Sequence, residues 1–422
     1  MKHIFAIERN PAISQIAPFR SPDGTPYADL YIGCRRETWP IRGQTLARKI
    51  QHAHFLREGA LMKPAALAGY LANLEAEAEF GGAEREVFLR AARHGDRLYI
   101  DLCDSDWRAI ELDHTGWRIV EKPPLRFLRS PSMRALPEPV LGGSIDALWK
   151  FVRIADEGDR TLVVSHLLSV LGAVEPTPIL YLVGGHGTAK STATALLRQL
   201  VDPNVAGLKT LPRSEQDLFV AAQQARVLAF DNLSDISNSM SDALCRIATG
   251  AAFGSRRFWT HGDEATLAAC NPMVANGITV AFTRPDLVDR TIAVRIDKMR
   301  DEDRKPRKDI LRDFDEAHPK MLGALCTALS MGLAREGKVK LPTLPRMADF
   351  AAWALACEPG FAPSLGILDA YQMNIATAVE DAIDDDEVRL MAFPQDGQQQ
   401  ADGATTRLAD NVPEKKQIHR GD

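Results

Sequence analysis

ILYLVGGHGTAKSTATALLRQL, residues 179–200, decides the fold of this chain. Its first five residues, Ile179–Val183, are apolar, too few for a helix and followed by glycine, so they predict a buried strand. A glycine-rich loop comes next, and a run of helix-forming residues extends from Thr192 to Leu200. A strand, a glycine-rich loop ending in Lys-Ser and a helix occur in this order in phosphate-binding loops.

Phosphate binding gives each part of this loop a chemical role. Glycines allow several backbone N–H groups to point at one phosphate, and the N-terminus of the helix adds a partial positive charge. Lys190 is expected to reach the outer phosphates of a nucleotide, and the Ser191 hydroxyl is expected to hold Mg²⁺. The predicted nucleotide-binding residues are Gly184, Gly185, His186, Gly187, Thr188, Ala189, Lys190, Ser191 and Thr192.

Ala189 departs from the usual pattern GxxxxGK[ST], which has a second glycine at this position. Alanine lacks the freedom of glycine at positive φ. The loop therefore either uses an ordinary backbone angle at Ala189 or is strained there. A plain glycine-rich turn is the alternative interpretation, but the flanking strand, the helix and the Lys-Ser pair together favour nucleotide binding.

The composition is that of an ordinary globular protein with room for two or three domains: 422 residues, 45% hydrophobic and 25% charged. A net charge of −5 argues against a protein coated in positive charge, but it leaves open a local basic patch or the channel of a ring. Six scattered cysteines without a CxxC pair indicate reduced thiols in a cytoplasmic protein. The longest apolar stretch, residues 161–174, is too short to span a bilayer, so no membrane association is expected.

The expected fold class is an α/β P-loop nucleotidase with a parallel sheet core, preceded by an α+β domain and followed by helices. Short strand patterns and two helical patterns, at 44–59 and 63–80, characterise the leading part. A segment rich in Pro, Gly and Ser then predicts a linker. The predicted division is an N-terminal α+β domain at 1–130, a linker at 131–144, a P-loop ATPase domain at 145–300, a C-terminal helical region at 301–392 and a disordered tail at 393–422.

A second acidic element follows the loop by about 40 residues. Residues 226–232, RVLAFDN, read as a buried strand ending at Asp231. The carboxylate of Asp231 would lie at the carboxyl edge of a parallel sheet, where it can hold Mg²⁺ directly or through water. A plain strand end before a turn is the alternative. Asn232 stands where many nucleotidases have a second acid, so catalysis would use another carboxylate, such as Asp235, or rest on positioning and charge stabilisation.

Residues 255–269 predict a hairpin with basic and aromatic residues near its tip. Arg256, Arg257 and His261 can contact phosphates, and Trp259 can stack on a base, so the hairpin is a candidate DNA-binding element. A hairpin packed by its aromatic residues, with solvated arginines, is an equally acceptable interpretation.

Asn276 and two arginines after it complete the candidate site. Asn276 lies near the end of an apolar segment, where an amide beside the γ-phosphate can orient water. Arg284 and Arg290 follow on a loop, and a rigidly held arginine can neutralise charge on the nucleotide of a neighbouring subunit. The alternative for both arginines is a surface salt bridge with Asp286 or Asp289.

Several segments taken together resemble one family. The sequence resembles the ATPase proteins of phages and integrated mobile elements in bacteria, which are similar to the helicase part of phage and plasmid primase–helicases in the superfamily 3 helicase and AAA+ group. The likeness covers roughly residues 25–385. The motifs that carry it are GGHGTAKS, VLAFDNLSDI, SDALCRIATG, VANGI, TRPDLVDRTIAVRI and LPRMADFAAWA.

This resemblance implies an AAA+-like core and a role for each site residue. Lys190 and Ser191 would form Walker A, Asp231 Walker B, Asn276 the sensor and Arg290 the arginine finger. The implied catalytic residues are Lys190, Asp231, Asn232, Asn276 and Arg290. Ser191 and Asp231 would hold the metal, and the hairpin around residues 257–261 would contact DNA inside a ring. Alanine and asparagine at positions 189 and 232 are usual in these relatives, and the catalytic base stays unnamed.

Two departures from the family pattern remain. Residues 269–273 read ACNPM where relatives tend to have an Arg-Pro pair. After Leu390 the chain continues as a low-complexity tail, whereas many relatives continue into a further small domain. This second difference is compatible with a truncated copy.

The leading hypothesis is a Mg²⁺-dependent ATP-hydrolysing ring, a DNA helicase or translocase in the replication of a phage or mobile element. Its partners would be ATP, DNA in single-stranded form, and copies of itself in a homo-oligomer, with a hexamer as one form. The alternative is an ATP-binding switch or assembly module with little turnover and no unwinding. A small-molecule kinase would leave Asn276, Arg290 and the leading domain without a role.

Overall fold

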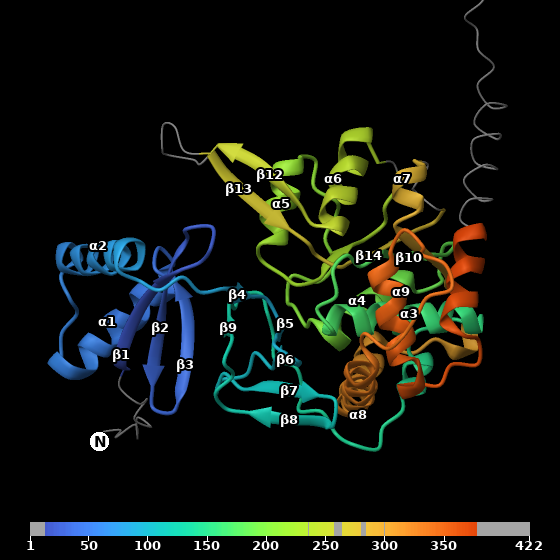
Figure 1. Ribbon diagram of the computed structural model, residues 1–422, viewed down its shortest axis with the longest axis horizontal. Coiled ribbons are helices and arrows are strands. Elements are labelled where there is room, and N and C mark those ends of the chain that lie inside the picture. Colours follow the sequence, from blue (N-terminus) through green and yellow to red (C-terminus); the bar gives the residue numbers. More distant parts are fainter. Residues whose placement is uncertain (1–12, 235, 257–263, 280–283, 299, 378–422) are drawn as a thin grey trace, which may run out of the picture.

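Three groups of elements follow one another in the computed structural model (Figure 1). The structure describes residues 13–377 except 235, 257–263, 280–283 and 299. The predicted tail at 393–422 therefore lies outside the described residues.

The first group is a three-stranded antiparallel sheet with two helices packed on it. Alternate residues of the middle strand, among them Ala28 and Leu30, pack against Leu46 and Leu74 of the helices, because successive side chains of a strand point to opposite faces. The helices lie where the sequence predicted them. The elements are β1 (Ile13–Arg20), β2 (Pro26–Ile32), β3 (Arg35–Pro40), α1 (Gln44–Glu58) and α2 (Pro64–Phe80).

The second group is an antiparallel meander in the order β5-β6-β7-β8, flanked by the short parallel pair β4-β9. Its strands are short and joined by tight turns, as at Gly95, whose φ of 61° suits glycine. The elements are β4 (Val87–Phe88), β5 (Ala91–His94), β6 (Arg97–Asp101), β7 (Ala109–Asp113), β8 (Gly116–Val120) and β9 (Arg126–Phe127).

The third group is a parallel sheet with helices on both faces. Its strand order is β11-β14-β10-β15, and every neighbouring pair is parallel. The strands are β10 (Ile179–Val183), β11 (Leu228–Phe230), β14 (Met273–Gly277) and β15 (Thr291–Arg295). The helices are η1 (Ile145–Lys150), α3 (Glu157–Leu171), α4 (Lys190–Val201), α5 (Glu215–Ala222), α6 (Asn238–Thr249), α7 (Pro285–Val288), η2 (Asp301–Asp303), α8 (Arg307–Arg335), α9 (Ala348–Cys357), η3 (Glu358–Gly360) and a helical stretch at 367–377.

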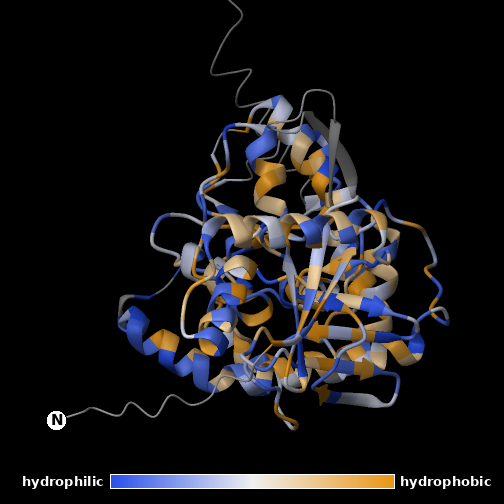
Figure 2. Ribbon diagram, turned by 90° about the vertical axis from the view of Figure 1, so that its left-hand side faces the viewer, coloured by the Kyte–Doolittle hydropathy of each residue, from blue (hydrophilic) through white to orange (hydrophobic). Residues whose placement is uncertain are grey.

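The alternation of β10 shows why its sequence is apolar throughout. Leu180 and Leu182 pack into the cluster formed with α3, α4, α8 and α9, whereas Ile179 and Tyr181 pack into a second cluster with α5 and α6. Both faces of the strand are buried, as is usual for parallel sheets between helices. Figure 2, turned so that the left-hand side of Figure 1 faces the viewer, shows hydrophobic and hydrophilic residues interspersed along the helices and strands. The protein therefore has a mixed α/β architecture with a parallel sheet.

The meander shares its main hydrophobic core with the third group, and it also contacts the first group through the Trp39–Trp107 ring pair and the Arg126–Asp29 ion pair at 2.8 Å. Leu98 and Ile110 belong to the same hydrophobic cluster as Leu325 of α8, while the first group has a separate cluster. A short meander needs a second layer to bury one face, and here α8 supplies it. Within the range predicted as one α+β domain, 1–130, the first group thus has a core of its own. The meander contributes one face to the core shared with α8 and the other to a smaller cluster that contains Tyr99, Leu125 and Phe127.

The predicted linker at 131–144 is held by backbone hydrogen bonds along its path. Arg134 N donates to Pro203 O, Leu136 N to Leu102 O and Val140 N to Pro319 O, each at 2.9 Å. The side chains of Met133 and Leu136 are buried. This segment thus connects the meander, the end of α4 and α8.

A buried ion pair joins the meander to the parallel sheet. Arg90, fully buried, donates from Nε to Oδ1 of Asp202 at 3.0 Å, and its other nitrogens donate to the carbonyl oxygens of Asp101 and Arg134 at 2.9 Å. Asp202 follows α4, and its Oδ2 accepts from Val227 N at 3.1 Å, just before β11. One carboxylate therefore ties three segments together.

Arg90→Met is expected to lower the free energy of unfolding by about 3–5 kcal/mol, because it leaves the Asp202 carboxylate buried without a cation. Arg57→Met is the control, since Arg57 forms an exposed pair with Glu58 and should change stability by no more than about 0.5 kcal/mol. Urea unfolding of both variants measures the difference. Equal losses in the two variants would show that the buried pair has no special role.

Candidate functional site

The glycine-rich loop runs from the end of β10 to the start of α4 with two residues at positive φ. Gly187 has φ +77°, and Ala189 has φ 60° and ψ 24°, in the left-handed region. The sequence left open whether the backbone at Ala189 has an ordinary angle or is strained, and the structure has the strained conformation. Gly184 is needed for another reason: a Cβ at this position would lie 2.7 Å from Oγ1 of the buried Thr188.

The loop presents polar groups to its surroundings. Lys190 Nζ and Thr188 Oγ1 both donate to the carbonyl of Gly185, at 3.2 and 3.1 Å, while His186 and Ser191 are exposed. Ala189 provides no side-chain cap for α4, and the first turn of this helix has no acidic residue. The first N–H groups of α4 and their partial positive charge thus remain available to an anion.

Asn276 joins this loop to the predicted acidic element. It is fully buried near the end of β14, opposite Leu182 of β10. Its Nδ2 donates to Thr194 Oγ1 at 3.0 Å and to Asp231 Oδ1 at 2.9 Å, and its Oδ1 accepts from Asn232 N at 3.1 Å. Thr194 in turn donates to the carbonyl oxygen of Lys190 at 2.8 Å. The structure therefore brings Lys190, Asp231, Asn232 and Asn276 to the same edge of the sheet.

Sequence reasoning missed Thr194. The one available signal was a polar side chain four residues after Lys190, about one helical turn, on a face otherwise occupied by Ala193 and Leu197. Asn232 was expected only as a replacement for an acid, yet its backbone has φ 53° and donates to Asn276. This residue type tolerates the left-handed region well.

Arg290 lies away from these residues. Its carbonyl oxygen accepts from Ile179 N, the first residue of β10, at 2.8 Å, whereas the glycine-rich loop follows the last residue of this strand. Its guanidinium forms an ion pair with Asp286 (3.3 Å), the alternative that the sequence offered. Arg284 pairs with Asp242 at 2.7 Å. Within one chain, Arg290 therefore lies at the opposite edge of the sheet from Lys190.

The basic hairpin is described only at its base. β12 (Ala251–Arg256) pairs antiparallel with β13 (Glu264–Ala269), and Arg256 lies opposite Glu264. Arg257 and His261 lie outside the described residues, as does Asp235. In Figure 1 the pair of strands projects from the side of the molecule near α5.

Asp159 is a further carboxyl group beside the end of β15. Its Oδ2 accepts from Arg295 N at 2.9 Å. Burial raises the pKa of Asp159 from 3.8 to about 6, with the charges of Asp156 and Asp297 acting in the same direction. Neither its position nor its raised pKa was foreseen from the sequence, because its neighbours come from a strand far along the chain.

Two absences hold within the described part of the chain. No group of three or more His, Cys, Asp and Glu residues has the arrangement needed to hold a metal ion. None of the helices there is both long and apolar enough to cross a membrane.

Ala189→Gly is expected to raise the free energy of unfolding by about 0.5–1 kcal/mol, because glycine relieves the left-handed strain and only part of this gain is lost to its greater freedom in the unfolded chain. Ala195→Gly, six residues further along the chain and inside α4, is the matched control and should lower stability by about 1 kcal/mol. Thermal and urea unfolding of both variants test the opposite signs. A loss of stability in both would mean that Ala189 is not strained.

Asp159→Asn should be more stable than the wild-type protein by about 1 kcal/mol at pH 7 and no more stable at pH 4. A raised carboxyl pKa means that the folded state binds the proton more tightly than the unfolded state. Wild-type stability therefore falls as the pH rises from about 4 to about 6, because in this interval the unfolded carboxyl has lost its proton while the folded one still holds it. Unfolding at the two pH values, with the exposed Asp96→Asn as control, checks this. A pH-independent difference would contradict the assignment.

Solved structures of one protein region match the chain at low identity. The A form apo structure of the NrS-1 C-terminal region matches with a TM-score of 0.41 and 13% identity, over 73% of this chain and 66% of that one. A second apo structure of the region matches with a TM-score of 0.42 and 11% identity, over 86% and 72%. The chain thus spans about two thirds of the length of the first of these structures. No curated protein matches by sequence.

A family model matches more than half of the chain, at residues 145–385. The matched part begins at η1 and contains the glycine-rich loop, Asp231, Asn276 and Arg290. Its description is "actinomycete integrative conjugative element replication protein". The chain therefore belongs to the family of actinomycete integrative conjugative element replication proteins.

Proposed function

We propose that this replication protein is a P-loop ATPase with an AAA+-like core that assembles into a ring and moves along DNA as a helicase or translocase. The observation that carries the proposal is the buried amide of Asn276, which hydrogen-bonds both Asp231 and the side chain of Thr194 in the helix after the glycine-rich loop. A phosphate-binding loop and a metal-binding carboxylate have to be neighbours for phosphoryl transfer.

The residues at this edge fit the substrate MgATP. The exposed loop and the uncapped N-terminus of α4 would bind the phosphates, and Lys190 would exchange its bond to the Gly185 carbonyl for the outer phosphates. Ser191 and Asp231 would hold Mg²⁺, which supplies charge neutralisation when bound. Asp231 Oδ2 has no hydrogen-bond partner among the described residues, so one carboxylate oxygen is free for this role.

One carboxylate, that of Asp231, together with the Ser191 hydroxyl provides enough protein ligands for Mg²⁺ in a nucleotide site. Mg²⁺ in nucleotide sites is usually held by one or two protein oxygens together with substrate phosphates and water. Asn232 cannot take a proton, so we propose that hydrolysis depends on positioned water and charge stabilisation rather than on a base at this residue.

The position of Arg290 supports an assembly of several copies. Arg290 lies at the edge of the sheet opposite Lys190 and so would act on the nucleotide of a neighbouring subunit, as an arginine finger does. A homo-oligomeric ring, such as a hexamer, satisfies this geometry. The hairpin β12–β13, with Arg256, Arg257 and His261, is proposed to contact single-stranded DNA in the channel, and the cytoplasm is the proposed compartment.

Lys190→Ala is expected to abolish ATP binding or turnover. Arg290→Ala should lower turnover about 1,000-fold, the lower range for arginine fingers, while ATP affinity changes less than about two-fold because this residue does not contact the nucleotide of its own subunit. Steady-state ATP hydrolysis and calorimetric ATP binding measure the two effects, with Arg57→Ala as an exposed control. Normal hydrolysis by Arg290→Ala would contradict the ring mechanism.

The alternative function is an ATP-binding switch with little turnover, which Asn232 favours. The two functions differ in their response to DNA. A helicase or translocase requires turnover that rises when single-stranded DNA is added, whereas a switch requires only ATP-dependent assembly. ATP hydrolysis with and without single-stranded DNA, alongside size measurements with and without ATP, distinguishes them.

A further inference from the structure

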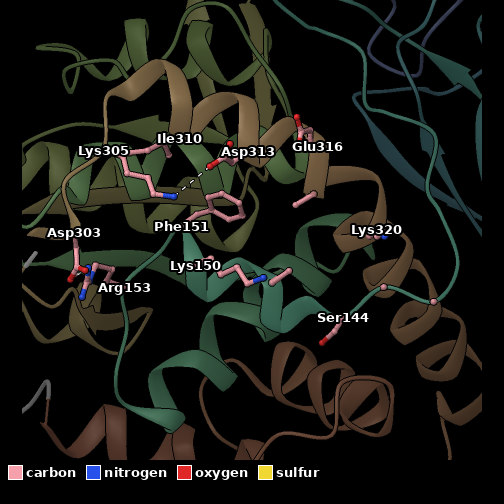
Figure 3. A pocket seen from close by; sticks show the side chains of 14 residues that line it. Ser144, Lys150, Phe151, Arg153, Asp303, Lys305, Ile310, Asp313, Glu316 and Lys320 are labelled. Carbon is pink, nitrogen blue, oxygen red and sulfur yellow. Dashed lines mark hydrogen bonds and ion pairs between the residues drawn. The ribbon is translucent and has the colours of Figure 1, made fainter.

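A cavity of about 560 Å³ lies between η1 and the first turns of α8 (Figure 3). Part of its wall is apolar and comes from both elements, with Ala147 and Phe151 on one side and Ile310 on the other. Charged side chains surround this wall, among them Lys150 and Asp303. A concave apolar surface with a few polar groups at its rim is the usual form of a small-molecule site, and its volume lies in the normal range of about 300–1,000 Å³.

Hydrogen bonds and an ion pair connect the wall of the cavity to the strand that precedes the glycine-rich loop. The carbonyl oxygen of Val183, the last residue of β10, accepts from Ile296 N at 2.8 Å, and the next residue, Asp297, donates from N to the Arg153 carbonyl at 3.0 Å. Arg153 forms an ion pair with Asp303 at 2.9 Å, and both side chains line the cavity. A Cβ placed on Gly187 of the loop would lie 3.8 Å from a guanidinium nitrogen of Arg304, the neighbour of Asp303.

The apolar part of the wall suits a flat ring. Phe151 packs edge-to-face against Phe314, with ring centroids 5.3 Å apart and an angle of 78° between the rings, so its ring is held in place. Lys150 and Lys320 have no ion-pair partner in the described part of the chain, although acidic residues line the same cavity. Their ammonium groups can donate to ring nitrogens or to sugar hydroxyls.

We propose that this cavity receives the base and the sugar of the nucleotide whose phosphates bind the glycine-rich loop. The proposal rests on the proposed ATPase function and extends it, since nothing in the loop itself distinguishes a nucleotide from a bare polyphosphate. Burial of the base against Phe151 and Ile310 would then supply the part of the affinity that inorganic triphosphate cannot obtain.

The test compares two probes, ATP and inorganic triphosphate, each with Mg²⁺, by calorimetry on the full chain. The wild-type protein is expected to bind ATP at least ten-fold more tightly than triphosphate. Ala147→Trp fills the cavity from η1 and should weaken ATP binding at least ten-fold, while triphosphate affinity changes less than two-fold. Ala72→Trp, at an exposed position of α2, is the matched control and should leave both affinities unchanged.

Ile310→Trp fills the cavity from the opposite wall, so it decides the matter if Ala147→Trp does not fold. Wild-type ATP affinity in a folded, cavity-filled variant overturns the proposal. If Lys190→Ala then still loses both probes, the proposed phosphate site survives without the cavity. If the wild-type protein binds neither probe, the proposed function fails and this proposal fails with it.

Discussion

The buried amide of Asn276 fixes the carboxyl edge of the parallel sheet. It holds α4 through Thr194, the end of β11 through Asp231, and the following turn through Asn232 N, with distances of 2.9 to 3.1 Å. Water cannot compete for these bonds, because the residue is fully buried. The next residue, Gly277, is equally constrained, since a Cβ there would lie 1.9 Å from the Tyr181 hydroxyl. The spacing between the loop and Asp231 depends on these two neighbours.

This arrangement constrains the proposed chemistry. Both amide hydrogens of Asn276 are already donated, to Thr194 and to Asp231. If Asn276 is to orient water, it must first exchange one of these bonds, whereas the side chain of Asn232 is exposed beside it. The polar groups at this edge of the sheet are therefore better suited to stabilising charge through fixed dipoles than to transferring a proton between an acid and a base. Arg290, at the other edge, can join them only from a second copy.

The sequence was sufficient to predict the strand and helices whose signals are local, whereas β1 (Ile13–Arg20) was not foreseen. The apolar run of β10, the glycines after it and the helices α1 and α2 follow from periodicity and turn residues over short stretches. The fully buried Arg90–Asp202 pair joins residues 112 positions apart, and the α8 partner of the meander is still more distant along the chain. No local pattern encodes such contacts, and a threonine in the first turns of a helix that also contains Thr192 gives little reason to expect the role of Thr194.

The central claim is that the loop between β10 and α4 binds the phosphates of a nucleotide. Amide hydrogen exchange of the wild-type protein, with and without saturating MgATP, tests it at individual peptides. The account predicts slower exchange over residues 184–192, where backbone N–H groups would bond phosphate oxygens, and over residues 231–233, where the metal would be held. Unchanged exchange in these segments under saturating MgATP, with slower exchange elsewhere or nowhere, would contradict it.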